Sequence, residues 1–239
     1  MNDLYVAAAG MASAMAGLEA AGFNLANAST PGFVRFEPLT ETVRGGPSPF
    51  QYASAPPDAV LSLHPSGPEV TGNPLDIYIN GSAFMALRSS TGGEVYTRNG
   101  ELSLQADAQG TLGLYAAGLP VLGQDGQPIV VASSDIEIGT DGTVLADGKQ
   151  QGRIKLVDPA GDRMVPMGNL TYATASGLPL PPTQNGSVTP EALEMPDVNT
   201  VTDMLRVLDV GQRYENLMSA VHSMEQNMQQ ATQVYTLNA

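Results

Sequence analysis

The sequence predicts an α+β protein in which long N- and C-terminal helices pack as a coiled-coil-like layer, with a central antiparallel all-β domain between them in the chain. Three observations lead to this class. Near both termini, apolar residues recur every three or four positions, as on one face of a helix. Between residues 75 and 172, short alternating runs are separated by Asn-Gly and Asp-Gly pairs, which are typical of hairpin turns. Proline-rich stretches connect the two kinds of segment.

The first helix is predicted to be about 25 residues long, from the range over which its apolar positions repeat. Asn2 or Asp3 can cap its first turn by accepting a backbone N–H. The helix is expected to end before Pro31, because proline disfavours helical geometry at the residue before it. The positions expected to pack against other helices are Leu4, Ala8, Met11, Met15, Leu18, Gly22 and Leu25.

The last helix is predicted to begin after Asp197 or Asn199 and to span on the order of 60 Å. Its expected packing positions are Val201, Met204, Leu208, Gly211, Tyr214, Met218, Val221, Met224, Met228, Ala231 and Tyr235. Both repeats use Ala, Gly and Met where a self-sufficient two-stranded coil would use Ile, Val and Leu. This composition favours packing among many neighbouring helices. The alternative interpretation is that both helices form the core of a monomer.

The central region is predicted to consist of short strands joined by tight turns. Asn80-Gly81 predicts a hairpin between residues 75–79 and 83–87, and Asn99-Gly100 predicts one between 95–98 and 101–104. Further turns at Asp125-Gly126, Asp141-Gly142 and Asp147-Gly148 divide the rest into short strands. Such spacing favours an antiparallel sandwich or a partly open barrel.

The expected domain organisation follows from these elements. Residues 1–34 are the N-terminal helix of a helical core domain, 35–74 a Pro-rich linker, 75–178 the β domain, 179–196 a Pro-rich return linker, and 197–239 the C-terminal helix of the core domain. Because the chain leaves the helical domain and returns to it, both termini are expected to lie together.

Composition excludes several classes of function. The 239 residues carry 10 Lys and Arg against 24 Asp and Glu, a net charge of −14, which argues against binding nucleic acid or an anionic membrane surface. The absence of Cys excludes disulfides and thiol chemistry. No apolar run is long enough to insert into a membrane. The first basic residue is Arg35, so no cleaved secretory leader is expected.

The sequence offers no recognisable catalytic site. His64 and His222 are the two histidines, and neither has a partner at the spacing of a metal site or a catalytic base. We therefore expect no enzyme activity, no catalytic residues, no cofactor and no metal. The alternative from another class is a secreted β-rich protein that acts on or binds carbohydrate. Its carboxylate pair would be distant along the chain and could not be located from one sequence.

Several segments nevertheless match a known family. The run NLANASTPGF, from Asn24 to Phe33, closes an Ala- and Met-rich helix and resembles the signature of bacterial flagellar rod and hook proteins. Residues 71–84 resemble the start of the family's β domain, 96–100 its first hairpin, and 198–215 its C-terminal helix. The chain departs from the family pattern at residues 20–23 and 211–213, which leaves the contact details open but not the membership.

The resemblance implies a structural subunit of the flagellar basal-body rod, exported by the flagellar type III apparatus and assembled in the periplasm, where the rod transmits motor torque. Its partners would be copies of itself, other proximal-rod subunits and the distal-rod protein. Chain length favours a proximal-rod member, with a distal-rod or hook-type protein as the alternative. The assembly interface is expected at the helix positions above together with Asn24, Asn27, Pro31 and Gly32.

Overall fold

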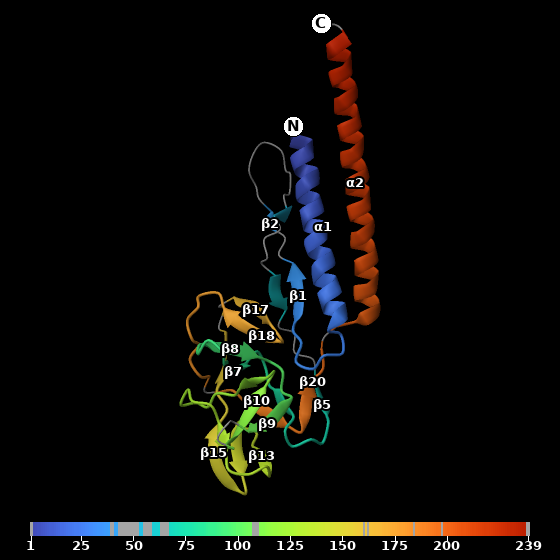
Figure 1. Ribbon diagram of the computed structural model, residues 1–239. Coiled ribbons are helices and arrows are strands. Elements are labelled where there is room, and N and C mark those ends of the chain that lie inside the picture. Colours follow the sequence, from blue (N-terminus) through green and yellow to red (C-terminus); the bar gives the residue numbers. More distant parts are fainter. Residues whose placement is uncertain are drawn as a thin grey trace. The chain divides into compact units, whose positions relative to one another are not determined.

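A computed structural model describes residues 2–38, 41–42, 53–54, 59–62, 67–106, 110–159, 161, 163–183, 185–196 and 198–237. Among these residues there are two helices and twenty short strands, which form two compact units (Figure 1). The first unit comprises Met1–Ala26, Phe36–Val60 and Val198–Ala239. The second comprises Asn27–Arg35 and Leu61–Asp197.

The predicted fold class is wrong, although the antiparallel β domain is present. Most described elements are strands, and the helical part is a single pair formed by α1 (Asn2–Ala26) and α2 (Thr200–Leu237) rather than a coiled-coil-like layer. A repeat of apolar positions shows that one face of a helix packs, but it does not say how many helices cover that face. Neither described helix combines the length and hydropathy required to cross a bilayer.

The two helices pack antiparallel through small residues. A methyl group added to Gly10 would lie 3.3 Å from Leu217 Cδ1, and one added to Gly17 would lie 3.6 Å from Val210 Cγ1. Glycine therefore lets the two backbones approach closely here. Buried or half-buried positions continue this inner seam along Ala7, Gly10, Ala14, Gly17, Ala21 and Asn24 of α1 and Val207, Val210, Tyr214, Leu217, Val221 and Met224 of α2.

The start of α2 confirms the capping predicted at Asn199. The side-chain Oδ1 of Asn199 accepts the N–H of Thr202 at 3.1 Å, as an N-cap residue does. α1 ends at Ala26, and the Thr30 N–H donates to the Asn27 carbonyl at 3.0 Å in the turn that follows. By the register of the inner seam, residue 2 lies opposite about residue 225. α2 therefore continues past the first turn of α1, as Figure 1 shows.

Short strands follow α1 in the first unit. β1 pairs with β4, and β2 pairs with β3. Asn24 fastens β1 to the last turn of α1, because its side chain donates to the Phe36 carbonyl and accepts the Phe36 N–H, both at 2.9 Å. The Phe23 and Phe36 rings meet edge to face at 5.1 Å. The strands are β1 (Arg35–Pro38), β2 (Glu41–Thr42), β3 (Ala53–Ser54) and β4 (Ala59–Ser62).

The second unit is built from small antiparallel sheets around an aliphatic core. Its largest sheet has the strand order β16-β7-β8-β18-β17. A second sheet joins β9, β11 and β12 to β10, a third has the order β13-β14-β15, and the pairs β19-β6 and β20-β5 complete the unit. The core contains Ile77, Met85, Leu114, Val144 and Ile154, all buried.

The strands of the second unit are β5 (Pro68–Val70), β6 (Ile77–Ile79), β7 (Phe84–Arg88), β8 (Glu94–Thr97), β9 (Leu102–Ala106), β10 (Leu112–Ala116), β11 (Leu119–Pro120), β12 (Val130–Val131), β13 (Ile136–Ile138), β14 (Thr143–Ala146), β15 (Lys149–Arg153), β16 (Leu156–Val157), β17 (Met164–Gly168), β18 (Thr171–Thr174), β19 (Val188–Pro190) and β20 (Ala192–Glu194).

Both predicted Asn-Gly hairpins are wrong, whereas the three predicted Asp-Gly turns are confirmed. At Asp125-Gly126 the Gly126 N–H donates to the Gly123 carbonyl at 2.8 Å. β6 pairs with β19 instead of β7, and β9 pairs with β10 instead of β8. The turns at Asp141-Gly142 and Asp147-Gly148 do join paired strands, β13 to β14 and β14 to β15. The Asn80 side chain instead donates to Ser187 Oγ at 3.1 Å, so it contributes to a long-range contact beside β19.

Candidate functional site

The contact positions predicted on α1 lie beside the inner seam rather than in it. Met15 and Leu18 are exposed, and nothing approaches the position of a β-carbon on Gly22. These three residues form the outer face of α1. Each follows an inner-seam position by one residue, which is about 100° around a helix. Met11 and Leu25 are half-buried, and the side chains of Leu4 and Ala8 lie outside the described part of the structure.

An apolar patch covers the first turns of α2. Val201 is 70% exposed, and Met204, Leu205 and Leu208 are more than half exposed. These four residues form the outer patch of α2, which faces roughly away from the inner seam at 100° per residue. Leu205 was not among the predicted contacts, although its place four residues after Val201 is a helical signal that could have identified it.

The remaining predicted positions of α2 divide between the two faces. Met218 is exposed, whereas Tyr214, Val221 and Met224 are half-buried in the inner seam. The side chain of Met228 lies outside the described part of the structure. The positions predicted near the start of α2 therefore lie on its outer side, whereas most of those predicted farther along lie in the inner seam.

The predicted positions after α1 belong to the second unit. Asn27 and Pro31 are half-buried, and Gly32 is buried with φ of +69°. The Gly32 N–H donates to the Glu194 carbonyl at 2.9 Å. A β-carbon on Gly32 would overlap the Asn99 backbone and would lie 2.7 Å from the Arg98 carbonyl carbon. The signature segment is therefore docked tightly on the β unit.

Arg98 and Glu194 organise this docking point. Nε of Arg98 donates to Glu194 Oε2 at 2.7 Å, and Nη2 donates to Oε1 at 3.0 Å. The other guanidinium donors reach the carbonyls of Gly81, Ala83 and Ile79 at 2.7–3.0 Å. All five donors of the buried guanidinium are thus used. Burial raises the pKa of the Glu194 carboxyl, while the hydrogen bonds from Arg98 oppose that rise.

Tyr172 also contacts the docked segment. Its ring is buried edge to face against Phe84, 5.8 Å between centroids, and the Arg98 guanidinium lies 5.8 Å from the same Phe84 ring. A backbone hydrogen bond from Val34 reaches the Tyr172 hydroxyl, yet burial raises the pKa of Tyr172 to about 12. Phe33 and Val34 are both buried, so the segment contributes apolar side chains as well as backbone bonds.

The second unit is expected to lose stability at high pH through Tyr172. Its pKa is raised from 10.0 to about 12 by burial, so the stabilising contribution is complete below pH 10 and is lost as pH rises toward 12. The loss is expected to reach about 2 kcal/mol near pH 11.5. Urea unfolding of the wild type and of Tyr172→Phe across this range measures it. Equal pH dependence in both proteins would contradict the prediction.

Sequence reasoning missed the residues that hold the segment. Arg98 lies in the run Tyr96–Gly100 that resembles the family, but that resemblance says nothing about its partner. Glu194 is 96 positions away and Tyr172 is 74 positions away, so no local pattern connects them with Arg98. Arg98 follows the end of β8 between the polar residues Thr97 and Asn99, so its local sequence gave no signal of burial either.

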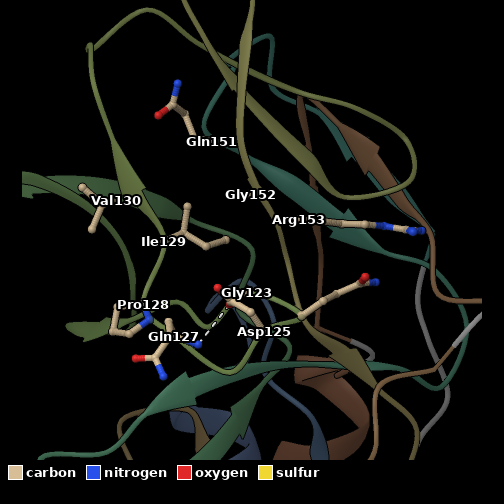
Figure 2. Close-up of a pocket in the computed structure, with 10 residues that line it drawn as sticks. Gly123, Asp125, Gln127, Pro128, Ile129, Val130, Gln151, Gly152 and Arg153 are labelled. Carbon is tan, nitrogen blue, oxygen red and sulfur yellow. Dashed lines mark hydrogen bonds between the residues drawn. The ribbon is translucent and has the colours of Figure 1, made fainter.

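A pocket of about 390 Å³ lies in the second unit between β12 and β15 (Figure 2). It is lined by Gly123, Gln124, Asp125, Gln127, Pro128, Ile129, Val130, Gln151, Gly152 and Arg153. Asp125 is the carboxylate among these lining residues, and its Oδ1 accepts the Gln127 N–H at 3.1 Å. Nε of Arg153 donates to the Asp141 carbonyl at 2.8 Å. The Asp125 carboxylate is therefore used within its own turn and Arg153 bonds to the turn after β13, and a carboxylate pair is not part of this wall.

Comparison with known proteins identifies the family. Residues 78–146, within the second unit, match the family model described as the flagellar hook protein FlgE/F/G D1 domain. The flagellar basal-body rod protein FlgF of Escherichia coli (strain K12) is 30% identical over 233 residues, 90% of each chain. FlgF of Mesorhizobium japonicum is 32% identical over 225 residues, again 90% of each chain. This chain belongs to the FlgF family of flagellar basal-body rod proteins.

Membership of the FlgF family confirms the expected resemblance to flagellar rod and hook proteins. A FlgG rod protein, from Agrobacterium fabrum, is also similar, with 28% identity over 247 residues that cover 90% of this chain and 92% of the relative. All three relatives are named as rod proteins, and none of them is named as an enzyme. The rod-protein signature thus coincides with the segment docked by Arg98, Glu194 and Tyr172.

Proposed function

We propose that this chain is a structural subunit of the flagellar basal-body rod, and that neighbouring subunits bind the outer face of α1 and the outer patch of α2. The observation that carries the proposal is the set of large apolar side chains which the helix pair leaves exposed. Covering each one fully would contribute about 1.5–3 kcal/mol. Membership of the FlgF family supports a rod subunit as the bearer of these surfaces.

The small number of charged residues on α1 and α2 also supports subunit contact at these two surfaces. α1 carries two acidic residues, and α2 carries four acidic and two basic ones, so the helices hold a small share of the net charge of −14. On α2, Arg213 and Asp209 form an exposed pair at 2.8 Å. A neighbour that covers these helices therefore has few charges to remove from water, which keeps the desolvation cost small.

The two surfaces differ in sequence, so contact between copies is expected to be head to tail. The α1 face of one copy would cover the α2 patch of the next, and this kind of contact generates a ring or a helical array rather than a closed dimer. Such an array requires stiffness and no chemical turnover. The proposal also includes periplasmic location, type III export, a proximal position and other rod subunits as partners. A FlgG-type role is the second candidate, favoured by the similarity to the FlgG protein.

A charge placed in the outer patch tests the proposal. Leu208→Glu is expected to weaken association of the full chain by about tenfold or more, because the new carboxylate would be buried in the contact. Asn216→Glu adds the same charge at another exposed position of α2 and should leave association unchanged. Sedimentation velocity measures association, and motility of a strain that carries each variant in place of its own copy measures rod formation. Normal motility with Leu208→Glu would reject the proposed surface.

A further inference from the structure

The sulfur atoms of this chain are unevenly placed. The sequence has eleven Met and no Cys, so thioethers are its sulfur groups. Met15 in the outer face of α1 and Met204 in the outer patch of α2 are each 59% exposed, and Met218 is 48% exposed farther along α2. Met85 and Met164 are buried in the second unit. The thioethers most open to an oxidant thus include two on the surfaces proposed for assembly.

We propose that Met15 and Met204 are oxidation sites at which conversion to the sulfoxide blocks subunit association. This inference rests on the proposed function of the helix surfaces. The oxidant is a peroxide: the thioether sulfur attacks one peroxide oxygen, the O–O bond breaks, an S–O bond forms, and the other oxygen leaves as water. The sulfur loses two electrons and the peroxide gains them.

The consequence follows from the surroundings of each sulfur. In the outer patch, the neighbours of Met204 are Val201, Leu205 and Leu208, whose side chains have no hydrogen-bond donor. A sulfoxide oxygen buried among them would lose its bonds to water without replacement. Each sulfoxide is therefore expected to weaken association by about tenfold. Oxidation acts on free subunits, because assembly covers the same sulfur atoms.

The test compares the full chain before and after limited treatment with hydrogen peroxide. Peptide mass spectrometry should find sulfoxide at Met15 and Met204 and none at Met85 or Met164. Sedimentation velocity should show association reduced about tenfold or more, restored when methionine sulfoxide reductases of both stereospecificities act with a dithiol as reductant. In that step the dithiol becomes a disulfide, and the sulfoxide oxygen leaves as water.

Two variants separate the sites. The double variant Met15→Leu, Met204→Leu should associate equally strongly before and after peroxide treatment. Met167→Leu with Met195→Leu removes two exposed thioethers of the second unit and should keep the full sensitivity to peroxide. If the oxidised wild-type chain associated as strongly as the untreated chain, this inference would be wrong, and the proposed function would be unaffected. An untreated chain that remains monomeric would overturn the copy-to-copy contact of the proposed function, and the inference with it.

Discussion

Replacing Glu194 by leucine is expected to lower the free energy of unfolding of the second unit by about 3–5 kcal/mol. The reason is that Arg98 stays buried and charged after its carboxylate partner is removed. Unpaired charge in the interior costs more than the net value of the pair itself. Urea unfolding of the full chain, followed by circular dichroism in the β region, measures the change.

An exposed ion pair in the same unit provides the matched control. Nε of Arg153 lies 3.8 Å from Oδ2 of Asp141 in a solvent-exposed ion pair. Arg153→Met is therefore expected to lower the free energy of unfolding by less than about 1 kcal/mol. The double variant of Glu194→Leu with Arg98→Met should lose less than the two single variants together, since it leaves no buried charge. A Glu194→Leu protein as stable as the Arg153→Met protein would show that the buried pair does not organise this region.

Replacing Gly32 by alanine is expected to destabilise the second unit by about 4 kcal/mol or more and to displace the signature segment. Two effects combine in this number. The backbone conformation, with φ of +69°, disfavours any side chain, and the added carbon would overlap the Asn99 backbone. Displacement then exposes the buried side chains of Phe33 and Val34. Hydrogen exchange at residues 32–35, together with urea unfolding, measures both consequences.

Gly177 separates the conformational effect from the overlap. It has the same φ of +69°, but nothing lies within 4 Å of an added β-carbon. Gly177→Ala is therefore expected to cost about 1 kcal/mol, from the backbone conformation alone. If both glycine variants lost equal stability, close docking of the signature segment would not be what requires glycine at position 32.

Local signals were sufficient where one segment decides its own structure. The repeat in the first 26 residues predicted α1, Asn199 predicted the start of α2, and the Asp-Gly pairs predicted turns between neighbouring strands. These elements depend on backbone geometry and on bonds between residues close in sequence. The signature from Asn24 to Phe33 likewise identified the flagellar rod and hook family before any contact was known.

Local signals could not predict which helix face packs against the other helix or which strands pair with each other. The 3–4 spacing on α1 predicted packing at Met11 and Leu18, whereas α2 packs against Gly10 and Gly17, each one residue earlier. Small residues carry little hydrophobic signal, yet they allow the closest approach between helices. The two Asn-Gly hairpins failed for a related reason, since β6 and β9 find better partners elsewhere in the unit.

The sequence by itself determined that the chain begins and ends in helices, that short antiparallel strands lie between them, and that it resembles rod and hook proteins. Tertiary structure alone decided which helix face pairs within the chain and which apolar patch stays exposed. It also brought Arg98, Glu194, Tyr172 and Gly32 together. The physical reason is that periodicity and turn preference act over a few residues, whereas packing and burial of charge depend on groups that meet only after the chain has folded.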